Sequence, residues 1–213
     1  MKNMFLSSSR YQRAAKGWSF GLALLTGAMA SAQTNYVRNP DFDQPLGPDN
    51  WQIVYVSTSS ESDFMIHGRS TIAHRDKVFG TWDGNYFGLH FKPYTDAPME
   101  AYATQTVSNL TASANYVVTA WMALHYEGGV GKVNMTLEAQ GDGSLAASDP
   151  CAGWTRGDSF DTNGWAAYSV TVPASANGTI EVRLHYQKPA YTANRKWLSA
   201  IDGFFDEVSV TPE

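Results

Sequence analysis

The chain has 213 residues, of which 15 are Lys or Arg, 20 are Asp or Glu and one is a cysteine. This acidic balance makes nucleic acid and anionic membranes poor partners, because proteins bind both by neutralising phosphate with Lys and Arg. A single cysteine, Cys151, excludes an intramolecular disulfide, so the fold must be stabilised by core burial or by a bound metal.

Residues 1–32 are predicted to be a signal peptide. Four basic and no acidic residues occupy the first 16 positions, an apolar run follows from Phe20 to Met29, and Ala30-Ser31-Ala32 forms a small-residue cleavage site. The run has about ten residues, short of the roughly 20 that cross a bilayer, so we expect no membrane insertion. We expect a secreted protein, extracellular, periplasmic or on a bacterial cell surface, with residues 33–213 as one domain. Its 11 basic and 20 acidic residues give a formal charge of −9.

The pattern after residue 32 is that of β-strands. Short stretches alternate or run apolar between clusters of Gly, Asn, Asp and Pro, and no helical period appears. The predicted strands are 51–56, 63–67, 86–91, 101–107, 116–126, 132–139, 166–172, 179–186 and 204–211. This number of strands in one domain predicts an all-β fold, a two-sheet antiparallel β-sandwich with jelly-roll topology.

Two strand predictions give finer expectations. In 116–126 the even-numbered residues form an apolar face, whereas Trp121 lies on a semi-polar face that would be open and concave. The stretches 166–172 and 179–186 look like consecutive antiparallel strands around a turn. Arg183 and His185 would then lie on a face that matches the one carrying Trp121.

Three stretches together resemble the galactose-binding-like jelly rolls, and among them the carbohydrate-binding modules found beside bacterial cellulases and xylanases. They are Val37-Arg38-Asn39-Pro40-Asp41-Phe42-Asp43 followed by Trp51, Gln105-Thr106-Val107 followed by Leu110 and Tyr116, and Ile201-Asp202-Gly203-Phe204-Phe205-Asp206-Glu207-Val208. The ending departs from the family pattern by an insertion, Gly203-Phe204-Phe205, so Asp202 and Asp206 are alternatives for one family position.

The resemblance implies a non-catalytic, lectin-like module that binds a polysaccharide through surface aromatics, with a separate carbohydrate-active enzyme as a second partner. Sugar recognition needs flat aromatic surface and a few fixed polar groups. The candidates are Trp82, Tyr86, Trp121, Trp154, Arg183 and His185. The alternative for the three tryptophans is a core or rim position, and Trp51 and Trp165, which begin strands, are expected in the core.

The resemblance also implies a structural Ca²⁺ between the first and last strands. Calcium takes six to eight oxygen ligands, many of them carboxylate or carbonyl oxygens. Asp43 and Asp206 are the first candidates, and Asp41 and Asp202 are the second. The alternative is that these acids cap turns.

Two other functions stay open. A cell-surface or matrix structural or adhesion protein could use the same fold through an apolar patch or an edge strand. A jelly-roll polysaccharide lyase or glycoside hydrolase would need paired acids drawn from Glu100, Glu127, Glu138 and Glu181. No catalytic residue is assigned, because the sequence contains no histidine pair of the zinc-enzyme type, no Gly-x-Ser-x-Gly elbow and no phosphate loop.

Overall fold

The computed structural model describes residues 34–56, 64–67, 88–93, 97–126, 133–152, 154–155, 165–190 and 201–213. The chain separates into two units, Met1–Ala32 and Gln33–Glu213, and all described residues belong to the second. Across these ranges no helix is long and apolar enough to span a membrane.

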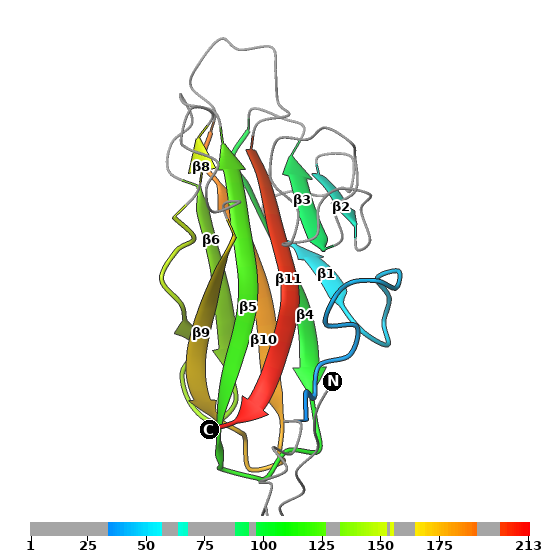
Figure 1. The fold of residues 1–213 in the computed structure, drawn as a ribbon, viewed down its shortest axis with the longest axis vertical. Coiled ribbons are helices and arrows are strands. Elements are labelled where there is room, and N and C mark those ends of the chain that lie inside the picture. The colour runs from blue at the N-terminus through cyan, green and yellow to red at the C-terminus, as the bar shows by residue number, and fades with distance from the viewer. Residues whose placement is uncertain are drawn as a thin grey trace, which may run out of the picture. The chain divides into compact units, whose positions relative to one another are not determined.

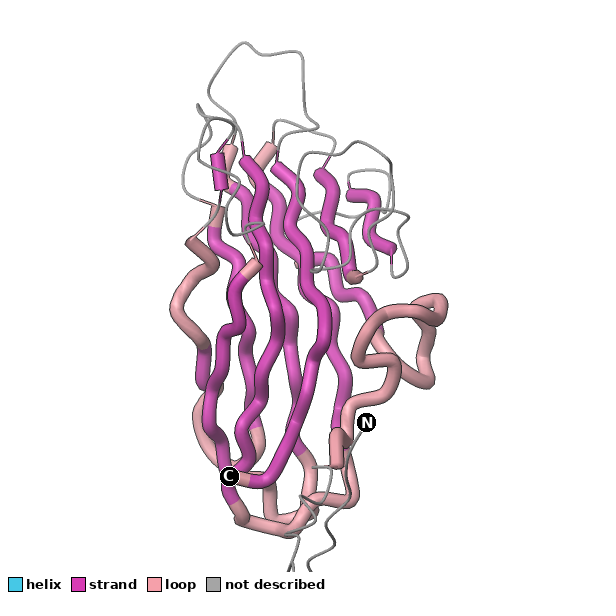
Figure 2. Tube along the Cα trace, in the orientation of Figure 1, coloured by secondary structure: helices cyan, strands magenta, loops and turns pink. Residues whose placement is uncertain are grey.

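Strands arranged in two sheets make up the described fold (Figures 1 and 2). Sheet A has the order β1 (Gln52–Tyr55), β4 (Met99–Val107), β10 (Ile180–Lys188), β6 (Asn134–Gln140) and β7 (Ala146–Ala147). Sheet B has the order β2 (Phe64–His67), β3 (Leu89–Pro93), β11 (Ile201–Pro212), β5 (Asn115–Tyr126) and β8 (Trp154–Thr155), and β9 (Ala166–Pro173) also pairs with β5.

The predicted all-β sandwich is confirmed. Each of the nine predicted strands is present, with ends shifted by up to three residues. The two additional strands, β7 and β8, have two residues each and are too short to leave an alternating pattern. Every pairing is antiparallel except that of β5 with β8.

The hydrophobic core lies between the sheets. From β5 it receives the even-numbered residues 116 to 124, as the alternation predicts, and from β10 it receives Ile180, Val182, Leu184 and Tyr186. The ring of Tyr186 stacks on Phe91 of β3 at 5.5 Å between centroids and 7° between planes, which joins the two sheets directly. Figure 1 shows β5 and β11 in front of β4 and β10.

The expected pairing of β9 with β10 is wrong. β9 pairs with β5 in sheet B, whereas β10 lies between β4 and β6 in sheet A. The connecting turn therefore crosses from one sheet to the other. Both strands direct every second side chain into the same core from opposite sides, and this gives the same alternating pattern as a hairpin.

The motif around Asn39 builds a turn. Asn39 has a φ of 50°, and its side chain binds the backbone of Gln44 twice, accepting from the N–H at 3.1 Å and donating to the carbonyl at 2.9 Å. Its carbonyl accepts the indole N–H of Trp51 at 3.1 Å, and Trp51 packs on Phe42 with ring centroids 5.4 Å apart. Trp51 is in the core, as predicted.

The three family-like stretches contact one another. The buried amide of Gln105 accepts the N–H of Arg38 at 2.8 Å and donates to the Arg38 carbonyl at 2.9 Å. On the other side, the Pro40 carbonyl accepts the N–H of Val208 at 3.1 Å, and the Asn35 side chain donates to the Val208 carbonyl at 3.0 Å. The first described segment is therefore held between β4 and β11.

We expect Gly203→Ala to destabilise the domain. A Cβ at this position in β11 would lie 2.7 and 2.8 Å from two ring carbons of Tyr186 and 3.1 Å from the sulfur of Met135. Overpacking of this kind costs about 1–3 kcal/mol, which lowers the Tm of a domain of this size by about 2–4 °C per kcal/mol. Thermal denaturation measures it. Gly47→Ala, with no atom within 4 Å of the added carbon, is the control, and equal melting of the two variants would contradict this packing.

Candidate functional site

The side chains of β10 that point away from the core form the centre of a polar surface. Antiparallel pairing sets Arg183 between Thr104 of β4 and Glu138 of β6, and sets His185 between Tyr102 and Thr136. We call this surface the polar face. Its members are Glu100, Tyr102, Thr104, Thr136, Glu138, Glu181, Arg183, His185 and Gln187, all on the outer side of sheet A.

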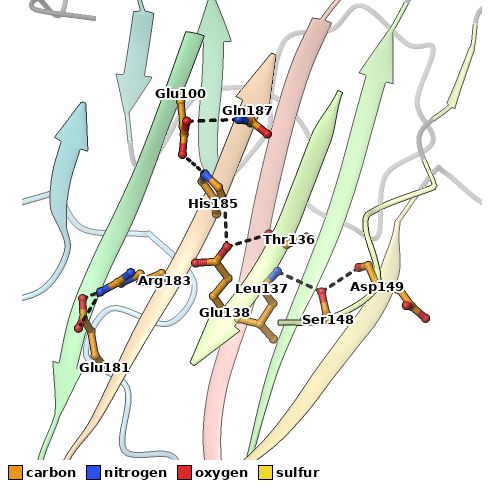
Figure 3. A network of polar contacts seen from close by, with 10 residues as sticks. All are labelled: Glu100, Thr136, Leu137, Glu138, Ser148, Asp149, Glu181, Arg183, His185 and Gln187. Carbon is orange, nitrogen blue, oxygen red and sulfur yellow. Dashed lines mark hydrogen bonds and ion pairs between the residues drawn. The ribbon is translucent and has the colours of Figure 1, made fainter. Parts of the chain in front are cut away.

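His185 joins two carboxylates across three strands (Figure 3). Its Nδ1 lies 2.8 Å from Oε1 of Glu138, and its Nε2 lies 3.0 Å from Oε1 of Glu100. Burial alone lowers the pKa of His185, but the hydrogen bonds and charges of Glu138 and then Glu100 outweigh it, so the pKa is raised. An imidazole that donates from both nitrogens is protonated, so this arrangement favours the imidazolium.

Neighbouring groups fix these two carboxylates further. The side-chain amide of Gln187 donates to Oε2 of Glu100 at 3.3 Å, and the hydroxyl of Thr136 donates to Oε1 of Glu138 at 3.3 Å. The exposed fractions of the side chains are 27% for Glu100 and 13% for Glu138. Both acids are therefore oriented by the protein and partly open to solvent.

Arg183 forms a second charged group on the same face. Its Nε and Nη2 donate to the two carboxylate oxygens of Glu181 at 2.8 and 3.2 Å, and the Thr104 hydroxyl donates to Glu181 at 3.0 Å. The hydrogen bond from Arg183 is the largest cause of the lowered pKa of Glu181. The guanidinium carbon also lies 5.2 Å from the ring centroid of Tyr102.

Trp121 does not join this group, contrary to the sequence prediction. It lies on the outer side of sheet B, where it packs on a small cluster of Ala123, Trp165 and Phe204, and Phe204 stacks on His90 at 4.5 Å. Alternation shows that a side chain points away from the core but leaves open which sheet carries it. Trp165 is buried as predicted, though in this cluster rather than in the main core.

The side chains of the other three aromatic candidates lie outside the described part of the structure. Trp82 and Tyr86 lie outside the described residues. Trp154 lies in β8, paired with His125 of β5, and only its backbone is described. Sequence reasoning missed Tyr102 and the joining of Glu100 and Glu138 through His185. The alternation in β4 and β6 indicates which side chains point outward. It does not show that these side chains meet His185 until the pairing of both strands with β10 is known.

The four metal candidates are spread over different environments. Asp41 and Asp43 are exposed, whereas Asp206 is fully buried and accepts the N–H of Glu207 at 2.8 Å. For Asp202 only the backbone is described. Across the described ranges, no three His, Cys, Asp or Glu side chains gather into a group that could hold a metal. Calcium binding at these four residues therefore stays a prediction.

No protein-family model and no curated protein sequence matches the chain. Solved structures do. TmCBM61, a carbohydrate-binding module solved with β-1,4-galactotriose, is 16% identical with a TM-score of 0.52, and the match covers 84% of this chain and 99% of that one. At this identity the likeness shows a shared fold, the two-sheet jelly-roll sandwich.

Two further similar structures have TM-scores below 0.5. The tandem CBM22 domains of Paenibacillus barcinonensis Xyn10C are 13% identical with a TM-score of 0.45, over 87% of this chain and 51% of that one. The active domain of tailspike protein 4 from bacteriophage CBA120 is 10% identical with a TM-score of 0.49, over 84% of this chain and 21% of that one.

We expect stability to fall as His185 loses its proton. Its pKa is raised in the folded state, so its contribution is complete below the ordinary value of about 6.5 and is lost as the pH rises through the folded-state value. One hydrogen bond to a charged group contributes about 1.5–3 kcal/mol. Tm measured from pH 5.5 to 9 should fall further for the parent protein than for His185→Gln. A difference in Tm between the two proteins that stays constant over this pH range would contradict the binding of a protonated His185 to the two carboxylates.

For calcium, the expected result is a rise in Tm of several degrees on adding millimolar Ca²⁺ and its reversal by chelator, because a ligand that binds only the folded state stabilises it. Mg²⁺ is the control, since it prefers a smaller octahedral site. Identical melting curves with Ca²⁺ and with chelator would show that Ca²⁺ does not stabilise the folded domain.

Proposed function

We propose that residues 33–213 form a secreted bacterial domain that binds a polysaccharide along the polar face and does not cleave it. The observation that carries the proposal is the pair of oriented, partly exposed carboxylates, Glu100 and Glu138, that His185 holds across β4, β10 and β6. The fold shared with carbohydrate-binding modules supports it by analogy.

The carboxylates suit the hydroxyl groups of a glycan. An ionised carboxylate only accepts hydrogen bonds, and it has more acceptor positions than the two bonds that each acid makes here. Hydroxyls donate to such groups in charge-assisted bonds. Because His185, Gln187 and Thr136 already fix these acids, less side-chain entropy is lost on binding.

Tyr102 supplies the aromatic surface that a pyranose needs. It is partly exposed in β4, pairs with the partly exposed Val54 of β1, and lies beside His185 with ring centroids 6.3 Å apart. A strand rises about 3.3 Å per residue, so the outward side chains from Glu181 to Gln187 extend over roughly 20 Å. That length favours an oligosaccharide segment over a single sugar.

The same geometry favours binding over hydrolysis. Glycosidases place two carboxyl groups on either side of the scissile bond, with space for the sugar and its attacking water. The imidazole ring of His185 lies between Glu100 and Glu138 and bonds to both. These two acids therefore support recognition, and a separate carbohydrate-active enzyme is the partner that we propose for any cleavage.

The adhesion alternative draws less support. In its apolar-patch form it requires contiguous exposed hydrophobic side chains. Within the part of the chain that the structure describes, Val56 and Leu145 are the exposed large hydrophobic residues.

We expect residues 33–213 to bind selected members of a plant, algal and bacterial glycan array, and Tyr102→Ala to weaken that binding at least tenfold, about 1.4 kcal/mol. Thr119→Ala, on the outer side of sheet B, is the matched control because its hydroxyl bonds only the exposed Ser169. Isothermal titration with the best glycan measures both.

Three other results would contradict the proposal in different ways. Unchanged binding by Tyr102→Ala together with loss in a Trp82→Ala, Trp154→Ala double variant would move the site to those tryptophans. Shortened glycans would show an enzyme. A folded domain that binds no glycan would favour the adhesion alternative.

A further inference from the structure

We infer that the polar face selects uncharged glycans and excludes chains that carry uronate or sulfate groups. This inference rests on the proposed function and concerns the chemical class of its ligand. It follows from the charges on the face and from the partners that each of them already has.

Both cations of the polar face are already bound to carboxylates. Arg183 makes a bidentate contact with Glu181 at 2.8 and 3.2 Å, and its side chain is only 26% exposed. His185 uses both ring nitrogens, one on Glu138 and one on Glu100. A ligand carboxylate that approached either cation would lie close to the acid already bound there, and displacing that acid would leave it without its partner in a half-buried position, which is unfavourable.

The other Lys and Arg side chains that the structure describes lie outside the centre of the polar face. Lys188 is buried, and its ammonium donates to the carbonyls of Ala97 and Pro189 at 2.7 and 3.2 Å. Arg38 donates to the side chain of Gln105 and the carbonyl of Thr106, both at 3.5 Å. Thr106 pairs with Glu181 and is six residues along β4 from Glu100, roughly 20 Å at the usual rise of a strand, so Arg38 lies near the end of the polar face that is farthest from Glu100.

The acids outnumber the cations. Three carboxylates, Glu100, Glu138 and Glu181, face two cations, Arg183 and His185, so the face has a formal charge of −1 when His185 is protonated and −2 when it is not. The domain as a whole is also acidic, with 11 basic and 20 acidic residues. Repulsion at the polar face disfavours an anionic chain, whereas its carboxylates can accept hydrogen bonds from the hydroxyls of an uncharged chain.

The experiment compares one polysaccharide in two charge states. The neutral glycan that binds best on the array is oxidised at its primary hydroxyls to carboxylates, and the affinity of residues 33–213 for both forms is measured by titration in low salt. We expect the oxidised form to bind at least tenfold more weakly.

A charge variant then locates the effect. Glu181→Gln removes the acid that binds Arg183. It should reduce the ratio of the affinities for the neutral and the oxidised polysaccharide at least threefold. Glu213→Gln removes the same charge from an exposed residue off the polar face and should leave this ratio unchanged.

The results separate this inference from the proposed function. Equal or tighter binding of the oxidised form would overturn charge selection and leave glycan binding standing. A ratio of affinities that Glu181→Gln and Glu213→Gln reduce equally would assign the selection to overall charge, which also overturns it. Absence of binding to any neutral or anionic glycan by the folded domain would overturn both.

Discussion

The pairing of β10 with β4 on one side and β6 on the other is the constraint on which both the core and the candidate site depend. Residues 180, 182, 184 and 186 of this strand enter the core, and residues 181, 183, 185 and 187 form the centre of the polar face. The pairing also sets Glu100 and Glu138 on either side of His185. A slip of one residue would exchange the two sets of side chains. Core packing therefore stabilises the same register that assembles the site.

Features that depend on local sequence could be predicted. The nine longer strands and the inner face of β5 follow from the alternation of apolar residues. This pattern occurs in any sheet that buries one of its faces. The motif residues Asn39 and Gln105 indicated the fold by resemblance, and the structure gives their physical role. Each uses a side-chain amide to bind a backbone that lacks a strand partner. Such bonds restrict these positions to an amide.

The site could not be predicted, because its residues come together through long-range pairing. His185 lies 47 positions from Glu138 and 85 from Glu100 in the chain. Alternation gives the inner or outer direction of each side chain, but neither the neighbouring strand nor the sheet. For that reason the alternation predicts matching faces for Trp121 and for Arg183 and His185, although the structure places them on opposite outer surfaces of the sandwich. The same limit explains why β9 and β10 resembled a hairpin.

The attachment of the first described segment to β11 has a consequence for the order of folding. The side chain of Asn35 bonds to the backbone of Val208 and Val210, which follow it by 173 and 175 positions. A ribosome makes the chain from its N-terminus, so these bonds cannot form until the last strand has been synthesised. Contacts over such separations are slow to form because a long loop must close first. The domain therefore completes its sandwich only after β11 has been synthesised.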